Sequence, residues 1–317
     1  MERELSRRHF LVAGFAALGA ALVRAPGAAE EAERTKRRMR LILLGTKGGP
    51  RPGGDRHAPS QVIVVDDVPY VVDCGNGVAW QFTAARLKLD RLRYVFLTHH
   101  HSDHNADYGN LLFLAWASGL KTPVDSYGPP PLENMTRLFF DMNAYDIRTR
   151  IADEGRPELA PLVRVHEIQA PGLVMQDERV RVTAALVQHP PVSPAFAYRF
   201  DGPDRSIVIS GDTTYSEALV NLAKGADVLV HEAMYLPGIE ALLKRVPNAT
   251  SLREHLLASH TSTEDVGRVA AKAGVKTLVL SHLVPGDDPS ITDAMWTDGV
   301  RQHFKGDIIV GRDLLEV

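Results

Sequence analysis

Four histidines and one aspartate follow a short apolar run in the segment Val95-Phe96-Leu97-Thr98-His99-His100-His101-Ser102-Asp103-His104. The 317-residue chain contains 13 histidines, so a random window of six residues would hold about a quarter of one, whereas residues 99–104 hold four. Imidazole and carboxylate ligands without a thiolate suit Zn²⁺, and also Mn²⁺ or Fe²⁺. A bend after His101 would leave one ligand pair for one metal and give Asp103 and His104 to a neighbouring metal.

Three further apolar runs lead directly into a possible metal ligand. Residues 185–188 precede His189, residues 207–211 precede Asp212, and residues 278–281 precede His282. The carboxyl ends of buried strands are where open α/β sheets build sites, because a strand end is rigid while the loop after it can open toward substrate. Asp212 has two carboxylate oxygens and can bridge two metals. These strand ends predict one site assembled from distant parts of the chain.

Short apolar runs alternate with longer helix-like segments from residue 39 onward. We expect a hairpin at 61–65 and 68–72, one helix at 131–151, and short buried strands at 228–230 and 277–280. Hairpins followed by strand–helix alternation in each half predict an α/β fold, with two sheets packed face to face and helices outside. The single cysteine, Cys74, excludes a disulfide within the chain.

The N-terminus resembles a twin-arginine export signal. Arg7 and Arg8 precede an uncharged apolar run at residues 10–23, and small residues follow. A helix of that length rises only ~21 Å, too short for a hydrocarbon core of about 30 Å. We expect residues 1–30 to be a cleaved signal, 31–38 a charged linker and 39–317 the hydrolase domain of a periplasmic or secreted protein. After cleavage no stable membrane anchor would remain. The alternative is that the apolar run at residues 10–23 forms a buried helix or a membrane anchor.

The motif His99-x-His101-x-Asp103-His104, followed along the chain by His189, Asp212 and His282, resembles the metallo-β-lactamase fold superfamily over residues 39–317. The resemblance implies a four-layer αβ/βα sandwich of two packed mixed sheets with outer helices. It also implies two Zn²⁺ ions, with Mn²⁺ or Fe²⁺ as alternatives. The implied ligands are His99, His101 and His189 for the first metal, Asp103, His104 and His282 for the second, and Asp212 as the bridge. Asp73, in the turn Asp73-Cys74-Gly75-Asn76-Gly77, is implied to orient a ligand histidine.

Two further motifs, Val230-His231-Glu232-Ala233 and Ser259-His260-Thr261-Ser262-Thr263, resemble those of one branch of this superfamily. That branch contains arylsulfatases, cyclic-nucleotide phosphodiesterases and tRNA 3′-processing endonucleases. The resemblance implies that Glu232 orients His260, and that His260 protonates the leaving group or binds its anion. His231 is expected to be a hydrogen-bonded histidine behind the ligands or in the core. The other histidines are expected to be structural or at the surface: His9, His57, His100, His166, His255 and His303.

These residues predict an exported dinuclear metal-dependent hydrolase of small anionic esters, either phosphodiesters or aryl sulfates. Two metals ~3.5–4 Å apart would share a water and lower its pKa toward about 7, which provides a bridging hydroxide at neutral pH. Asp103 would hold this nucleophile in place. Nucleic acid is not expected as a partner, because 36 basic and 39 acidic residues give a net charge of −3 without a basic patch. Homo-oligomerisation stays open.

Three alternatives remain at this point. The first is a tRNA 3′-processing endonuclease, whose family carries an RNA-binding arm between the positions of His189 and Asp212; here these are 23 residues apart, with room for one hairpin. The second, a lactonase or other acyl hydrolase, also keeps the bridging aspartate and would not need the pair of Glu232 and His260. The third, a non-catalytic metal-dependent binding protein, is disfavoured because the ligand set is complete.

Substrate specificity is expected to lie in three segments, at residues 48–59, 129–171 and 236–257. Their composition names no substrate. Phe139, Phe140, Met142 and Tyr145 could form an apolar pocket wall, but a stripe at helical spacing is more often part of a core.

Overall fold

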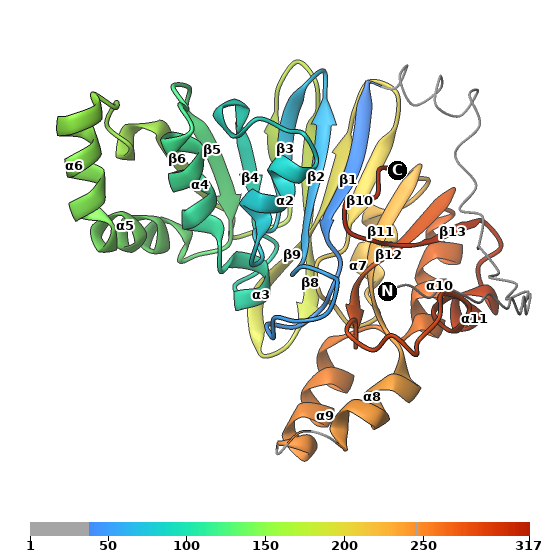
Figure 1. Ribbon diagram of the computed structural model, residues 1–317. Helices are drawn as coiled ribbons and strands as arrows, with labels where there is room; N and C mark the ends of the chain where they lie inside the picture. Colours follow the sequence, from blue (N-terminus) through green and yellow to red (C-terminus); the bar gives the residue numbers. More distant parts are fainter. Residues whose placement is uncertain (1–37, 245, 247) are drawn as a thin grey trace, which may run out of the picture. The chain divides into compact units, whose positions relative to one another are not determined.

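Two mixed β-sheets flanked by helices make up the described part of the chain (Figure 1). The computed structural model describes residues 38–244, 246 and 248–317. The first sheet has the order β1 (Met39–Gly45), β2 (Ser60–Val65), β3 (Val68–Val72), β4 (Tyr94–Phe96), β5 (Val124–Gly128) and β6 (Val163–Glu167). The second has the order β13 (Asp307–Val310), β12 (Thr277–Val284), β11 (Val228–Met234), β10 (Ser206–Ile209), β9 (Val192–Asp201), β8 (Arg181–His189) and β7 (Gly172–Gln176).

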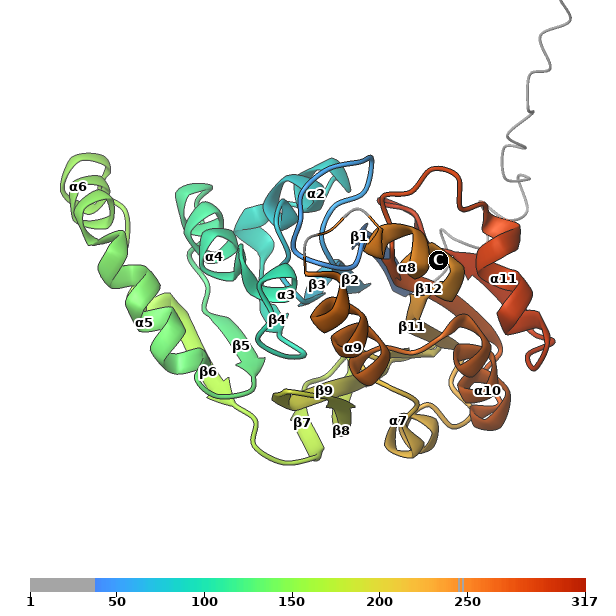
Figure 2. The same ribbon diagram turned by 90° about the horizontal axis from the view of Figure 1, so that it is seen from below.

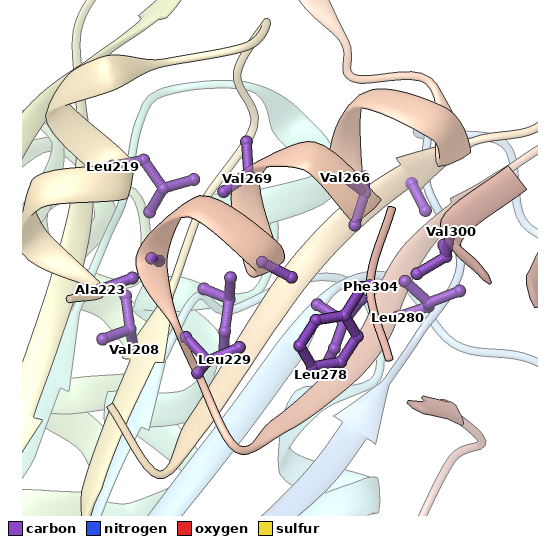
Figure 3. Packing of buried hydrophobic residues seen from close by; sticks show 14 of the residues in the cluster. Val208, Leu219, Ala223, Leu229, Val266, Val269, Leu278, Leu280, Val300 and Phe304 are labelled. Atoms are coloured by element: carbon purple, nitrogen blue, oxygen red, sulfur yellow. The ribbon is translucent and has the colours of Figure 1, made fainter. Parts of the chain in front are cut away.

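Helices flank both sheets. Those of the first half are α2 (Val78–Ala84), α3 (Ser102–Asn105), α4 (Tyr108–Ala117), α5 (Leu132–Met142) and α6 (Ala144–Glu154). Those of the second half are α7 (Glu217–Leu222), α8 (Leu236–Leu243), α9 (Ala249–Ser259), α10 (Thr263–Ala273) and α11 (Asp293–Arg301). Apolar side chains of α2 and α4 pack on the first sheet, and those of α7, α10 and α11 pack on the second. Figure 3 shows the second cluster, in which Val266 and Val269 of α10 face Leu229 and Leu278.

A third apolar cluster lies between the two sheets. Successive side chains of β1 point to opposite faces of its sheet. Leu41 and Leu43 belong to the cluster between the sheets, whereas Ile42 and Leu44 belong to the cluster under α2 and α4. Strands buried on both faces read as continuous apolar runs, which explains the sequence pattern. The predicted four-layer sandwich with outer helices is therefore confirmed.

Several predicted boundaries are wrong. The helix expected at 131–151 is two helices, because the chain breaks at Asn143, whose side-chain amide donates to the carbonyl of Phe139 (2.8 Å). The strands expected at 228–230 and 277–280 extend to Met234 and Val284, so that polar site residues lie inside them rather than after them. Parallel pairing of β11 with β12 supplies the hydrogen bonds that support these polar extensions.

Two strands at the sheet edges, β6 and β7, have no long apolar run and are mostly exposed or half-buried, so their sequences carried little strand signal. The predicted export signal at 1–30 lies outside the described residues, as does all of the predicted linker except Arg38. Within residues 38–244, 246 and 248–317, no helix has the length and apolar character required to cross a bilayer.

Candidate metal centre

The structure gathers seven predicted ligands at one end of the two sheets. The first sheet and its following turn supply His99, His101, Asp103 and His104, and the second sheet supplies His189, Asp212 and His282. His189 ends β8, and Asp212 follows β10. His282 lies in β12, where the register with β11 skips one residue and the backbone has a φ of 42°. A bulge of this kind turns a side chain out of the ladder, and here it directs His282 toward the other ligands.

The first cluster consists of His99, His101, His189 and Asp212. Nδ1 of His101 lies 3.2 Å from Nε2 of His99 and 3.0 Å from Nε2 of His189. Asp212 Oδ2 lies 3.8 Å from each of those Nε2 atoms. Tetrahedral Zn²⁺ with ligand bonds of 2.0–2.1 Å would place its ligand atoms about 3.3 Å apart, so this donor set fits such an ion.

The second cluster consists of Asp103, His104, Asp212 and His282. Asp212 Oδ2 lies 3.3 Å from Nε2 of His104 and 3.1 Å from Nε2 of His282. Asp103 Oδ2 lies 3.7 Å and 3.3 Å from the same two nitrogens. Because Asp212 belongs to both clusters, its position matches that of a carboxylate shared by two cations.

Hydrogen bonds behind the ligands fix which ring nitrogen faces the centre. Asp73 Oδ2 lies 2.8 Å from Nδ1 of His104, and the carbonyl of Ser259 lies 2.8 Å from Nδ1 of His189. Both contacts leave Nε2 as the free acceptor, the arrangement that metal-ligating histidines require. Nε2 of His104 and Oδ1 of Asp212 are buried without a hydrogen-bond partner, which a pair of cations would explain.

Asp73 is positioned by a tight turn. Its other oxygen accepts from the backbone N–H and hydroxyl of Thr98, and its backbone has a φ of 62°. Gly75 follows it, and a Cβ at Gly75 would overlap the carbonyl oxygen of Asp103. The turn therefore brings β3 close against α3 and holds Asp73 beside His104.

Burial and charge set the protonation states of the metal-free centre. Burial lowers the pKa of His99 well below its usual value and that of His189 to about 4. Burial also opposes ionisation of Asp212, but His104 and His282 outweigh it and hold the pKa of Asp212 well below its ordinary value. Although burial disfavours a charged His282, Asp212 and Asp103 raise its pKa to about 10. Cation binding at the second cluster must therefore displace protons.

Glu232 and His260 lie beside the two clusters. Glu232 Oε1 accepts from the backbone N–H groups of Thr213 and Thr261, and Oε2 lies 3.3 Å from Nδ1 of His260. The same His260 nitrogen lies 3.9 Å from Asp212 Oδ2. Burial opposes a charged His260, but Glu232 raises its pKa above the usual value. Glu232 thus favours the protonated form of His260 and lies where it can orient this imidazole next to the centre.

His231 lies on the opposite face of β11 from Glu232, because successive side chains of a strand alternate. It is fully buried, and its Nδ1 lies 2.7 Å from the backbone carbonyl of Glu232. Its strand neighbours Leu229 and Ala233 belong to the cluster under α7 and α10. The structure therefore places His231 in the core rather than among the ligands.

A cavity of about 310 Å³ opens above the metal centre. Residues 47–51 form one side and α8 and α9 form another, so two of the three segments expected to hold specificity do line it. The third, 129–171, contributes no lining residue; Phe139 packs against Gly109 of α4, and Met142 and Tyr145 are exposed. Figures 1 and 2 show α8 and α9 projecting at the strand ends, on the same side as α3.

His255 is the site residue that the sequence analysis missed, since it was assigned to the structural or surface group. It lies on α9, and its ring centre is 6.0 Å from that of His101, 6.1 Å from that of His189 and 5.9 Å from that of His260. Its helical spacing of one turn from Ser259, whose carbonyl holds His189, was the available signal. His57 is half-exposed, and its Nδ1 lies 2.9 Å from Oδ2 of Asp313. His57 is not among the residues that line the cavity.

A sandwich of two sheets with two adjoining clusters of histidine and carboxylate defines a dinuclear metal-dependent hydrolase of ester bonds. The chain belongs to the metallo-β-lactamase fold superfamily, since the family model described as "Beta-lactamase superfamily domain" matches residues 70–283. Ribonuclease Z of Mycobacterium bovis (strain BCG / Pasteur 1173P2) is 32% identical over 282 residues, which cover 88% of this chain and 98% of that protein.

Two solved structures share the fold. The metallo-beta-lactamase fold protein YhfI of Bacillus subtilis has a TM-score of 0.65 and 21% identity, and covers 88% of this chain and 98% of its own. The short form of human tRNase Z (ELAC1) has a TM-score of 0.63 and 21% identity, with the same coverage of both chains. At these identities the similarity describes the fold.

The comparisons overturn two expectations. We expected a hydrolase of small phosphodiesters or aryl sulfates and no nucleic-acid partner. Both expectations are contradicted by relatives named ribonuclease Z, which match over nearly their whole length. The short interval between His189 and Asp212 is filled by β9 and β10, as expected, but it does not separate this chain from those relatives. Net charge is a poor guide to a nucleic-acid partner, because it sums the whole chain and says nothing of the charge at one cavity.

Proposed function

We propose that this chain is an endoribonuclease that hydrolyses a phosphodiester bond in tRNA precursors, with two Zn²⁺ ions held by the seven ligands described above. The observation that carries the proposal is the placement of His260, 3.3 Å from Glu232 and 3.9 Å from the shared Asp212. A phosphodiester of RNA has a poor leaving group, a ribose oxygen, and its departure requires a proton donor. The 32% identity to ribonuclease Z supports the same substrate class.

When bound, the cations would polarise the scissile phosphate and lower the pKa of the attacking water. The chain's own residues position the attacking water and supply the proton for the leaving group. Asp103 is held in place by the backbone N–H of Gly49, which donates to Oδ2 (2.9 Å), and it can accept a hydrogen bond from the water. His260 gives its proton to the departing oxygen as the bond to phosphorus breaks, and Glu232 stabilises the charged form of His260 before that transfer.

The test uses the purified full chain loaded with Zn²⁺. A tRNA precursor with a 3′ extension should be cut at one position, and EDTA should abolish the cut. Asp212→Ala should lose the activity and much of the bound metal, whereas Lys121→Met, an exposed change on the first half of the chain, should keep both. Wild-type protein that binds two metals and cleaves bis(p-nitrophenyl) phosphate, an aryl sulfate or a lactone but not the precursor would refute the proposal.

The export signal is a separate proposal, supported by Arg7, Arg8 and the apolar run at 10–23. Zinc as the native metal also stays a proposal, supported by the imidazole and carboxylate donors. Elemental analysis of protein purified without added metal distinguishes Zn²⁺ from Mn²⁺ and Fe²⁺.

A further inference from the structure

The loop that joins β1 to β2 contacts two ligands of the second metal cluster through its glycines. The backbone N–H of Gly49 donates to Oδ2 of Asp103 (2.9 Å). Gly48 lies so close to the ring of His282 that a Cβ on this glycine would be 2.6 Å from Cε1. The N–H of Gly48 also donates to the carbonyl of Leu283, the residue after that ligand (3.0 Å). The backbone of the β1–β2 loop therefore limits where both ligands can lie.

One carboxylate, that of Asp313, joins the two ends of the β1–β2 loop. Its Oδ1 accepts from the hydroxyl of Thr46 (2.7 Å), the first residue after β1. Its Oδ2 accepts from the backbone N–H of His57 (2.6 Å), near the other end of the loop, and lies 2.9 Å from Nδ1 of the same residue. Each oxygen of the carboxylate thus holds one end of the loop.

The surroundings of Asp313 favour strong hydrogen bonds. Its side chain is only 10% exposed, and hydrogen bonds to an ionised carboxylate are roughly twice as strong as those between neutral groups. The guanidinium of Arg56 donates to the hydroxyl oxygen of Thr46 (2.7 Å) and to the carbonyl of Gly311 (2.6 Å). Burial lowers the pKa of Arg56, and Asp313 opposes that shift electrostatically. The base of the loop is therefore a connected network around one carboxylate.

Asp313 belongs to the C-terminal segment, which connects the two halves of the fold. The segment leaves β13 of the second sheet and then runs beside β1 of the first sheet. The N–H of Leu314 donates to the carbonyl of Leu43 (2.7 Å), and the N–H of Leu43 donates to the carbonyl of Leu315 (3.0 Å). These backbone bonds fix the residues next to Asp313, so its carboxylate is a firm point of attachment for the loop.

We propose that Asp313 is a positioning residue for the second metal cluster. It closes the β1–β2 loop at its base, and the closed loop holds the ligands Asp103 and His282 through its glycines. Asp313 itself bonds the ends of the loop and acts on the ligands only through the loop backbone. The inference rests on the two-cation site of the proposed function, and it does not depend on RNA as the substrate.

The first test measures amide hydrogen exchange in the metal-free protein. In Asp313→Asn one end of the loop loses its acceptor, whichever way the new amide turns. Exchange at residues 47–51 should therefore become about tenfold faster or more. Asp293→Asn is the matched control, because it makes the same chemical change at an exposed residue that pairs with Arg312 (2.8 Å) rather than with the loop. It should leave exchange at residues 47–51 as in wild type.

The second test measures zinc affinity by competition with a chromogenic chelator. Asp313→Asn should weaken the second equivalent of Zn²⁺ about tenfold, at the low end of the losses that follow when support behind a ligand is removed. The first equivalent should stay within about threefold, because Asp103 and His282 belong to the second cluster and not to the first. Asp293→Asn should leave both equivalents unchanged.

A pair of changes at Thr46 repeats the test if Asp313→Asn does not fold. Thr46→Val removes the hydroxyl that donates to Asp313 and keeps the shape of the side chain, so the second equivalent should weaken about fivefold. Thr46→Ser keeps the hydroxyl and should stay within about twofold of wild type. Equal effects of the two changes would contradict a role for the hydroxyl, and with it the closure of the loop by Asp313.

Three results would overturn the positioning role. They are unchanged exchange at residues 47–51, faster exchange there with an unchanged second affinity, and equal losses of both zinc equivalents. The second result would mean that the loop moves without moving the ligands, and the third would mean a general loss of structure. Wild type that shows both expected effects but does not cleave a tRNA precursor would instead overturn the proposed function alone.

Discussion

Asp73 provides the sharpest test of how the centre is held. Replacement by Asn keeps the size of the side chain and suits the left-handed backbone at this position, where φ is 62°. It removes the carboxylate that accepts from His104 Nδ1 at 2.8 Å. Losing a carboxylate partner of a ligand histidine costs about 10- to 100-fold in metal affinity, which corresponds to about 1.4–2.8 kcal/mol. The loss should fall on the second metal, because His104 belongs to that cluster.

Competition with a chromogenic zinc chelator measures both affinities. Asp73→Asn should weaken the second equivalent of Zn²⁺ by that factor and leave the first within about threefold. Asp67→Asn is the matched control, since Asp67 also has a left-handed backbone (φ 63°) but is exposed. Equal loss at both equivalents, or no loss at either in a variant with a wild-type melting midpoint, would show that Asp73 does not act through His104.

Further outcomes follow from the same geometry. Glu232→Gln should lower kcat on the tRNA precursor by about 10²-fold or more while changing bis(p-nitrophenyl) phosphate turnover little, because nitrophenolate leaves without a proton; equal losses on both would contradict the acid role of His260. Affinity for the second Zn²⁺ should rise with pH between 6 and 9, because His282, with a pKa of about 10 in the metal-free protein, binds metal only after losing its proton; a chelator titration that is flat with pH would contradict this sign. N-terminal sequencing of protein recovered from the periplasm should give a sequence that starts near residue 30. Protein that still begins with Met1 would contradict the predicted export signal.

His99, His189, Asp212 and His282 could be singled out in the sequence because each follows an apolar run that reads as a strand, whereas the full set of ligands was implied by the family resemblance. Such runs give the sheet edge at which ligands meet, without any knowledge of the pairing. The orientation of His282 could not be predicted in this way, since it depends on a bulge that forms only when β12 pairs with β11. The break at Asn143 was equally hidden, because the apolar spacing of α5 and α6 is continuous in the sequence.

The cavity was harder to predict than the metal centre. Lys47, Arg51 and His255 carry no local pattern that marks them, and they become neighbours only through the placement of α9 and the loop after β1. The sequence therefore indicated which segments line the cavity, but not which of their side chains face it.

Each sheet contributes an incomplete set of ligands, and His104 and His282 face one another across the boundary between the two halves of the chain. A cation at this place would act as a cross-link between layers that are otherwise joined by apolar contacts and by hydrogen bonds such as that from the Tyr198 hydroxyl to the carbonyl of Leu97 (2.8 Å). Removal of the cations by a chelator should therefore weaken the contact between the two sheets before the sheets themselves unfold. Amide exchange should then become faster first at the ends of β4, β10 and β12. In such a protein the supply of metal would govern mechanical integrity and catalysis together.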